Sequence, residues 1–297
     1  MKSYLLQNEN NLQQMRTLIA QLTQPTVVDF EETMLLPTVR ANTRLWQVNE
    51  ELAGFAFVDD YNNLRFEIAP KFHIKQLEDE IIAWGITCVQ NRNAETGAHD
   101  TLDAAFSRDN SWQIALLERN GFVQASQRTL SYARSLDVPI VPYPFPPGFQ
   151  LRAANGASEI ENLVALHQAA FGTDNMTVAQ RLAIMQAPDY EPELDLVAVT
   201  ASGELAAFCI CSIEAGKDGE KVGYTDPIGT HPHYQQQGLG KAIVTAGLQF
   251  LQARGTAVAK LGTSSTNMPM QRLAEALGFT CVSEKLWFSK EVAKHDQ

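Results

Sequence analysis

Long hydrophobic runs are absent from this chain of 297 residues. No stretch approaches the roughly 18 consecutive apolar residues that a membrane-spanning helix needs. The first residues, MKSYLLQNENNLQQMR, become polar after the sixth position, which leaves no room for the hydrophobic core of a signal peptide. We therefore expect a cytoplasmic protein that has no membrane partner.

Clusters of basic residues are absent as well. The chain carries 34 acidic and 23 basic residues, and its formal net charge is −11. A surface that binds nucleic-acid phosphates needs clustered Lys and Arg side chains, so we expect no nucleic-acid partner. The acidic balance mildly favours a cationic or amine ligand, although surface charge says little about a pocket.

Cysteine is scarce, with four residues at Cys88, Cys209, Cys211 and Cys281. Cys209 and Cys211 lie in AAFCICSI, which is typical of a buried strand, and their spacing of two puts them on the same face. No second pair has zinc-site spacing, so we interpret them as packing thiols rather than metal ligands. His231 and His233 offer two ligands without a third, and we expect no metal.

Proline is concentrated in one segment, DVPIVPYPFPPGFQ at 137–150, which holds five of the 13 prolines. Such a run excludes a helix or a central strand and favours an extended, semi-rigid spacer. The length of the chain independently suggests two domains. The predicted organisation is a first domain at 1–137, a proline-rich linker at 138–148 and a second domain at 149–297.

The two halves of the sequence repeat each other. The matching pairs are ELAGFAF (51–57) with ELAAFCI (204–210), APKF (69–72) with HPHY (231–234), and NSWQIALLERNGF (110–122) with NMPMQRLAEALGF (267–279). They occur in the same order at nearly constant offsets, which indicates a tandem duplication. Each half predicts a strand, one or two helices, two strands, a helix, a strand, a helix and a strand, and thus an α/β fold with a mixed sheet.

Glycines and glutamines follow a predicted strand in the segment HPHYQQQGLG at 231–240. The helix after it has apolar residues at helical spacing, and Gly255 is a plausible stop. Its apolar positions are Leu239, Ile243, Gly247, Phe250 and Leu251.

The start of that helix is suited to an anion. The first turn of a helix leaves backbone N–H groups without partners, and glycines let a ligand approach them closely. A phosphate fits such a position, and Lys241 would add positive charge. The spacing is neither GxGxxG nor a GK[ST] loop. A tight strand-to-helix turn without a ligand is the alternative.

The pattern Gln235-x-x-Gly238-x-Gly240 resembles the pyrophosphate loop of the GNAT N-acetyltransferase superfamily. The segment STNMPMQRLAEALGF (265–279) resembles a later segment of that family, in which an Asn opens a helix that ends in Gly-Phe. The resemblance covers about 148–292, and a tandem layout with one eroded half is similar to mycothiol synthase-type enzymes. It implies two tandem acyl-CoA N-acyltransferase-like domains.

The same resemblance implies acetyl-CoA as co-substrate, with its pyrophosphate in the glycine loop and its pantetheine arm between two strands that separate at a bulge. Asn267 would lie near the CoA arm, although an Asn at a helix start also serves as an N-cap. The residues implied in cofactor binding are Ile228, Gly229, Thr230, Gln235, Gln236, Gln237, Gly238, Leu239, Gly240, Lys241 and Asn267.

Acetyl transfer to an amine needs a neutral amine and hence a proton acceptor. The usual base position of the family corresponds to Tyr224, where many relatives carry Glu. Asp226, two residues on and on the same face, is our first candidate for the base, while a cap of the turn before Pro227 is its alternative role. Tyr224 would line the acceptor pocket or donate a proton. Ala274 stands where a Tyr often acts as general acid, so the general acid is not identified.

The first half lacks the glycine loop. Aligning Pro70 with Pro232 places Gln76 opposite Gly238, and the segment KFHIKQLEDEII has no glycine. Glu78 would stand opposite Gly240, and acidic side chains would repel a diphosphate. We expect no CoA binding there and a structural or substrate-shaping role instead.

The resulting hypothesis is an acetyl-CoA-dependent N-acetyltransferase that acts on a small amine or amino-acid-like acceptor. Transfer would be direct, within a ternary complex, and the second half would be the active one. The alternative is a non-catalytic CoA-binding regulatory or scaffold protein, because the family's glutamate and tyrosine are missing from positions 224 and 274.

Overall fold

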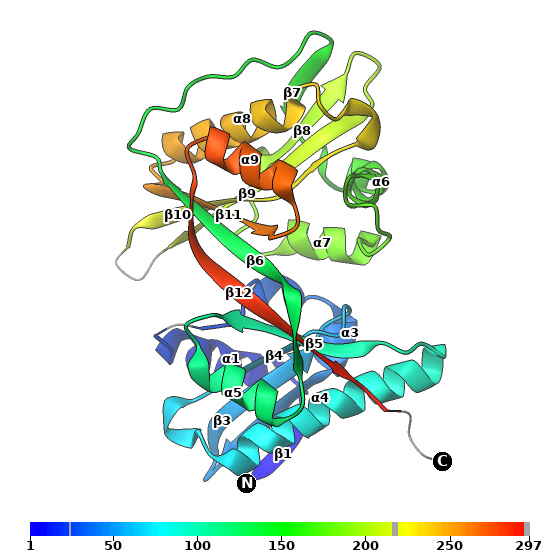
Figure 1. Cartoon of the computed structure of the whole chain (residues 1–297), viewed down its shortest axis with the longest axis vertical. Helices are drawn as coiled ribbons and strands as arrows, with labels where there is room; N and C mark the ends of the chain where they lie inside the picture. Colours follow the sequence, from blue (N-terminus) through cyan, green and yellow to red (C-terminus); the bar gives the residue numbers. More distant parts are fainter. Residues whose placement is uncertain (24, 216–218, 294–297) are drawn as a thin grey trace. The chain divides into compact units, whose positions relative to one another are not determined.

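The computed structural model describes residues 1–23, 25–215 and 219–293. Its chain forms two compact units (Figure 1). The first comprises Met1–Arg128 together with the C-terminal residues from Lys285, and the second comprises Thr129–Glu284. No helix in the described part of the chain has the length and apolar character needed to cross a membrane.

The first unit contains a four-stranded antiparallel sheet in the order β1-β2-β3-β4. A further strand, β5, pairs antiparallel with the Lys285–Glu291 part of β12. The elements are β1 (Lys2–Leu5), α1 (Glu9–Gln21), α2 (Phe30–Thr33), α3 (Pro37–Ala41), β2 (Thr43–Val48), β3 (Glu51–Val58), β4 (Leu64–Ile68), the 3-10 helix η1 (Pro70–Phe72), α4 (Lys75–Thr96), β5 (Thr101–Ser107) and α5 (Ser111–Arg119).

The second unit contains strands in the order β6-β11-β10-β9-β8-β7. Only the β10–β11 pair among these is parallel, so the sheet is mixed as predicted. The elements are β6 (Val123–Ser135), β7 (Phe149–Ala153), η2 (Gly156–Glu159), α6 (Ile160–Phe171), α7 (Val178–Gln186), η3 (Pro192–Leu194), β8 (Asp195–Thr200), β9 (Leu205–Ala215), β10 (Lys221–Thr230), η4 (Pro232–Tyr234), α8 (Leu239–Ala253), β11 (Val258–Ser264), α9 (Met268–Ala276) and β12 (Thr280–Glu291).

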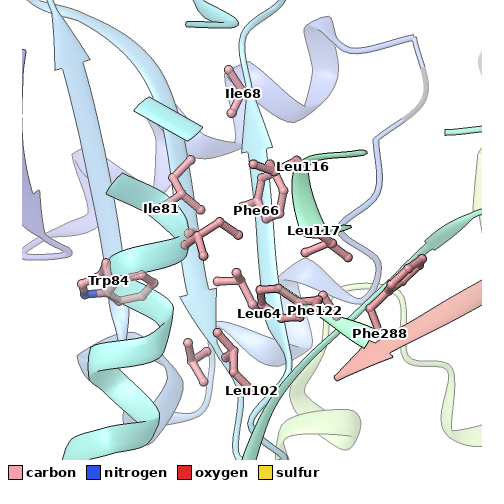
Figure 2. Close-up of a cluster of buried hydrophobic side chains, with 14 of the residues drawn as sticks. Leu64, Phe66, Ile68, Ile81, Trp84, Leu102, Leu116, Leu117, Phe122 and Phe288 are labelled. Atoms are coloured by element: carbon pink, nitrogen blue, oxygen red, sulfur yellow. The ribbon is translucent and has the colours of Figure 1, made fainter. Parts of the chain in front are cut away.

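Alternating residues of the first unit's central strand β3 bury both of its faces. Ala56 and Val58 join a core that includes residues of α4 and α5, whereas Phe55 and Phe57 join a second core with α1. Figure 2 shows how the side chains of the first core, among them Phe66 of β4 and Ile81 of α4, converge on one another. Burying each large apolar side chain contributes about 1.5–3 kcal/mol.

The second unit is likewise covered on both faces of its sheet (Figure 1). Along β8, Leu196 and Ala198 pack into a core with α8 and α9, while Val197 and Val199 pack into a core with α6 and α7. Helix α8 ends as predicted, because Gly255 follows the C-cap with φ +76°.

Two details of the predicted packing can be compared with the structure. Phe250 does not belong to the buried face of α8, because its side chain is 37% exposed. Cys209 and Cys211 are buried as expected, and their sulfur atoms lie 3.7 Å apart in the core beneath α8.

The tandem repeat is confirmed in structure, because the matching segments form equivalent elements. The first pair of segments forms β3 and β9, the second η1 and η4, and the third α5 and α9. One detail was wrong: three strands, not two, lie between the early helices and the central helix of each half. The third is β4 in the first unit and β10 in the second.

The boundaries of the compact units differ from the predicted domains. Residues 129–137 lie in the second unit because β6 pairs with β11 from Thr129↔Ser264 to Ser135↔Val258. Lys285 and the residues after it lie in the first unit because β12 pairs there with β5. The proline-rich segment 138–148 therefore lies inside the second unit and is not a spacer between the two.

Candidate active site

The start of α8 is open to an anion. Gly238 is the N-cap with φ +88° and offers no side-chain cap, and the first helical bond runs from Ala242 N to Gly238 O at 3.0 Å. The backbone N–H groups of Leu239, Gly240 and Lys241 therefore lie in the turn that lacks intrahelical acceptors. Together with the helix dipole, they form a site suited to a phosphate.

Glycine is required at Gly238 for two reasons. Its backbone lies in the left-handed region, and an added Cβ would lie 3.1 Å from the hydroxyl oxygen of Tyr143. At Gly240 the restriction is milder, because a Cβ would meet Leu273 at 3.5 Å, an ordinary contact. These backbone positions fit the close approach of a diphosphate.

The glutamines of the loop support its backbone. Gln235 Nε2 donates to Thr230 O at 3.3 Å, and Gln237 Nε2 donates to His233 O at 3.4 Å. Gln236 adopts a left-handed conformation with φ +60°. The three glutamines are exposed, and two of them connect the loop to the backbone carbonyls of Thr230 and His233.

Strands β10 and β11 separate beside this loop. Their parallel ladder runs from Val222↔Val258 to Tyr224↔Lys260, while β10 continues to pair with β9 as far as Thr230. The register with β9 shifts between Thr225 and Ile228, which marks a bulge. The bulge thus lies in β10, the strand that also contains Ile228, Gly229 and Thr230, and it precedes these three residues.

Asp226 lies in this bulge, before a cis peptide bond to Pro227. Its Oδ2 accepts a hydrogen bond from Gly262 N of β11 at 2.9 Å. Asp226 therefore lies within β10 and not in a turn, which corrects the alternative role considered from the sequence. Pro227 offers no N–H to a neighbouring strand, which agrees with the separation of the strands here.

Tyr224 and Asp226 face away from α8. Gly223 of β10 faces α8, because an added Cβ would lie 2.8 Å from a methyl group of Leu251. Alternation puts Tyr224 on the opposite face, where the Lys260 ammonium lies 6.0 Å from its ring centre. This face thus combines a phenol, a carboxylate and an amine, and all three side chains are half-buried.

The next residues of β10 form the edge that faces the gap. Ile228, Gly229 and Thr230 pair with Cys209, Phe208 and Ala207 of β9. Gly229 leaves no room for a side chain, since an added Cβ would clash with the Phe208 ring and lie 2.8 Å from Ala170 of α6. The close packing of α6 on β10 therefore needs this glycine.

His167 of α6 packs beside that contact. Its ring stacks on Phe171 at 4.6 Å and on Phe208 at 5.3 Å between ring centres. Burial, with a smaller contribution from the positive charge of Arg181, lowers the pKa of His167 to about 4. The imidazole is therefore neutral at pH 7. No motif in the sequence distinguishes this histidine.

Acid should weaken the second unit through His167. Because its pKa is lower in the folded chain than the unfolded value of 6.5, protons favour the unfolded state as pH falls from 6.5 toward 4. The full pKa shift, halved because the ring is partly exposed, lowers the free energy of unfolding by about 1 kcal/mol between pH 7 and pH 5. Urea unfolding of wild type and His167→Phe should show this difference, and parallel pH dependences would contradict it.

Asn267 and Ala274 occupy defined positions on α9. Asn267 is the N-cap, and its Oδ1 accepts from Met270 N at 3.2 Å. Ala274 is fully buried in the core between α9 and the sheet. Position 274 therefore supplies no general acid.

His231 and His233 interact with each other rather than with a third ligand. His231 Nδ1 accepts from His233 N at 3.3 Å, and their rings meet edge-on at 4.8 Å. Within the described parts of the chain, no cluster of three or more His, Cys, Asp or Glu residues is arranged to hold a metal ion.

The corresponding region of the first unit is built differently. Only His73 and Ile74 separate η1 from α4, whereas 235–238 separate η4 from α8. The loop before the helix is therefore shorter in the first unit than in the second. Counting from the helix starts, Ile74 rather than Gln76 stands opposite Gly238, which corrects the ungapped alignment.

Carboxylates occupy the first turns of α4. Arg119 binds Glu78, and Lys75 Nζ lies 2.6 Å from Asp79 Oδ2, which holds the pKa of Asp79 below its ordinary value. Trp46 Nε1 donates to Glu80 at 3.1 Å. The shallow depression of about 530 Å³ here is lined by Lys75, Gln76, Asp79, Glu80 and Ala83.

Comparison with known proteins points to one family. Residues 160–279 match the acetyltransferase (GNAT) family. The matched part makes up about two fifths of the chain. It spans α6 to α9 and includes the glycine loop and the separated strands, so the protein is an N-acetyltransferase by class.

Relatives and solved structures extend the likeness over both units. Mycothiol acetyltransferase of Arthrobacter sp. (strain FB24) is 28% identical over 78% of this chain and 72% of its own length. That of Thermobispora bispora is 29% identical over 78% and 77%. A tandem GNAT protein from the clavulanic acid biosynthesis pathway has a TM-score of 0.73 at 15% identity, covering 99% of this chain and 98% of that one. The fold is therefore that of tandem GNAT proteins.

Some residues near the GNAT site were not foreseen from the sequence. Tyr143 lies in the segment interpreted as a linker, and Lys260 and Gly262 lie on a strand without a motif. No sequence pattern marks them, because each contacts a predicted site residue only when the fold brings β10, β11 and the proline-rich segment together.

Proposed function

We propose that the second unit transfers the acetyl group of acetyl-CoA to the amine of a small molecule. The observation that carries this proposal is the glycine-opened start of α8 beside the separated strands β10 and β11, within the GNAT match at 160–279. The relatives are named for mycothiol, and from that name we infer a small-molecule acceptor for this chain as well.

The backbone amides of residues 236–241 would hold the diphosphate of acetyl-CoA, with Lys241 adding charge. The pantetheine arm would enter where the β10–β11 ladder ends, along the edge formed by Ile228, Gly229 and Thr230. Asn267 uses its Oδ1 as a helix cap, so its Nδ2 is the side-chain atom that would meet the CoA arm.

Acetyl-CoA supplies the acetyl group as a thioester. Asp226 accepts a proton from the acceptor amine, through water, so that the nitrogen lone pair attacks the carbonyl carbon. Backbone N–H groups on the free edge of β10 stabilise the charge that develops on the oxygen. The carbon–sulfur bond breaks, and the thiolate leaves without a general acid because a thiol of pKa about 8.5 is a competent leaving group. Transfer is direct within a ternary complex.

Tyr224 and Lys260 line the acceptor side of this site. They share the face of Asp226 and lie across the sheet from α8. The first unit holds no acetyl-CoA, because its loop before α4 is short and α4 carries carboxylates in its first turns. Its role is structural or substrate-shaping. A cytoplasmic location stays a prediction from the sequence.

A panel of small amines and amino-acid derivatives tests the proposal. With acetyl-CoA present, we expect at least one amine to cause release of the CoA thiol, which a colour reaction detects. The same amine should give an N-acetylated product in mass spectrometry. Binding of acetyl-CoA without thiol release across the panel would instead support the non-catalytic CoA-binding protein. Absence of binding would contradict both functions.

A further inference from the structure

The proline-rich segment 138–148 runs along α8 inside the second unit (Figure 1). At its beginning, Gln252 of α8 donates through Nε2 to Leu136 O at 2.5 Å, and Arg134 Nη2 donates to Pro139 O at 3.0 Å. At its end, Phe149 packs edge-on against Tyr234 at 5.6 Å between ring centres. The segment therefore passes from the C-terminal end of α8 to its N-terminal end.

The same segment is anchored to the core in its middle. Ile140 and Phe145 pack against the cluster that α8 and α9 form with the sheet. Five prolines fix φ along 137–150 and provide no N–H groups, so the segment keeps an extended form with little entropy to lose. Tyr143, between the two anchors, is consequently held at a defined place.

That place is the start of α8. The Tyr143 hydroxyl oxygen lies 3.1 Å from the position of a Cβ on Gly238, and the Lys241 ammonium lies 4.7 Å from the centre of the Tyr143 ring. The side chain is 38% exposed, and within residues 1–23, 25–215 and 219–293 its hydroxyl has no hydrogen-bond partner. A hydroxyl that has no partner in the described part of the chain thus lies beside the loop of backbone amides.

We propose that Tyr143 is a ligand of the acetyl-CoA diphosphate. Its hydroxyl donates a hydrogen bond to a phosphate oxygen, and its ring holds the Lys241 ammonium at the first turn of α8. The proline-rich segment is in this way the third wall of the diphosphate site, beside the loop 235–238 and the helix start. This inference rests on the proposed function, because it assumes that acetyl-CoA binds at Gly238.

Binding measurements separate the hydroxyl from the ring. A hydrogen bond to a charged group should make Tyr143→Phe bind acetyl-CoA about tenfold more weakly in calorimetry. Tyr143→Leu should bind more weakly still, and its effect should be less than additive with that of Lys241→Met because the ring positions that ammonium. Tyr61→Phe, at an exposed tyrosine of the first unit, should bind like wild type.

Phosphorus NMR of bound CoA distinguishes a direct contact from a structural effect. Tyr143→Phe should shift the diphosphate resonances and leave the 3′-phosphate resonance in place, with an unchanged melting temperature. Wild-type affinity or tighter binding in Tyr143→Phe would overturn the inference, the latter because Tyr143 would then be a lid. If either of these contradicting results came with a wild-type protein that binds acetyl-CoA and a Gly238→Glu variant that does not, only the inference about Tyr143 would fail. The proposed function would stand. If the wild type failed to bind, the proposed function would fall first.

Discussion

Replacing Gly238 with glutamate should raise the Kd for acetyl-CoA at least about 100-fold, or about 2.7 kcal/mol. The residue has φ +88°, so any side chain strains the N-cap of α8, and its Cβ would press on Tyr143. The new carboxylate would also stand at the backbone amides that the diphosphate needs, where two anions repel each other. Titration calorimetry with acetyl-CoA measures the loss.

Gly255→Glu is the matched control for this prediction. Gly255 follows the other end of α8 with φ +76°, and nothing lies within 4 Å of an added Cβ. The same substitution there imposes a similar backbone strain on the same helix without touching the loop. Equal losses of binding in both variants would point to damage of the helix and would contradict the assignment of the loop.

Asp226→Asn should lower the rate of acetyl transfer by about 100-fold or more while leaving acetyl-CoA binding intact. An amide cannot accept the proton of the amine, but its oxygen can still accept the hydrogen bond from Gly262 N that Asp226 receives at 2.9 Å. The bulge of β10 is therefore preserved and only the base is removed. Steady-state thiol release with an accepted amine gives the rate.

Two companion variants make the result interpretable. Asp226→Ala removes both the base and the bond to Gly262, so it should lose thermal stability in addition to rate. Tyr224→Phe keeps the ring near Lys260 and should retain far more activity than Asp226→Asn. A wild-type rate in Asp226→Asn would exclude Asp226 as the base.

The sequence was sufficient where backbone chemistry depends on residue type. Gly238 and Gly240 after a strand predict an open helix start, and that is the geometry found at α8. The repeat between the halves predicted equivalent elements because the same apolar and turn residues recur in order. The bulge in β10 followed from the family resemblance, and Pro227, which has no N–H, lies in it.

Other features depend on partners distant in sequence. The prolines of 137–150 indicate an extended chain, but only the contacts of Tyr143 with Gly238 and Lys241 show that it lies along α8. The shortened loop of the first unit was hidden by an alignment without gaps. Likewise, Asp226 meets Gly262 because β10 and β11 are neighbouring strands, although the two residues are 36 positions apart in the sequence. Local patterns give no strand register over such a separation.

The most direct test of the account is a crystal structure of the protein with acetyl-CoA. We predict one acetyl-CoA per chain, its diphosphate within hydrogen-bond distance of the backbone amides at 236–241 and its thioester in the gap between β10 and β11. Density for the nucleotide at α4 of the first unit, or anywhere away from α8, would contradict the account.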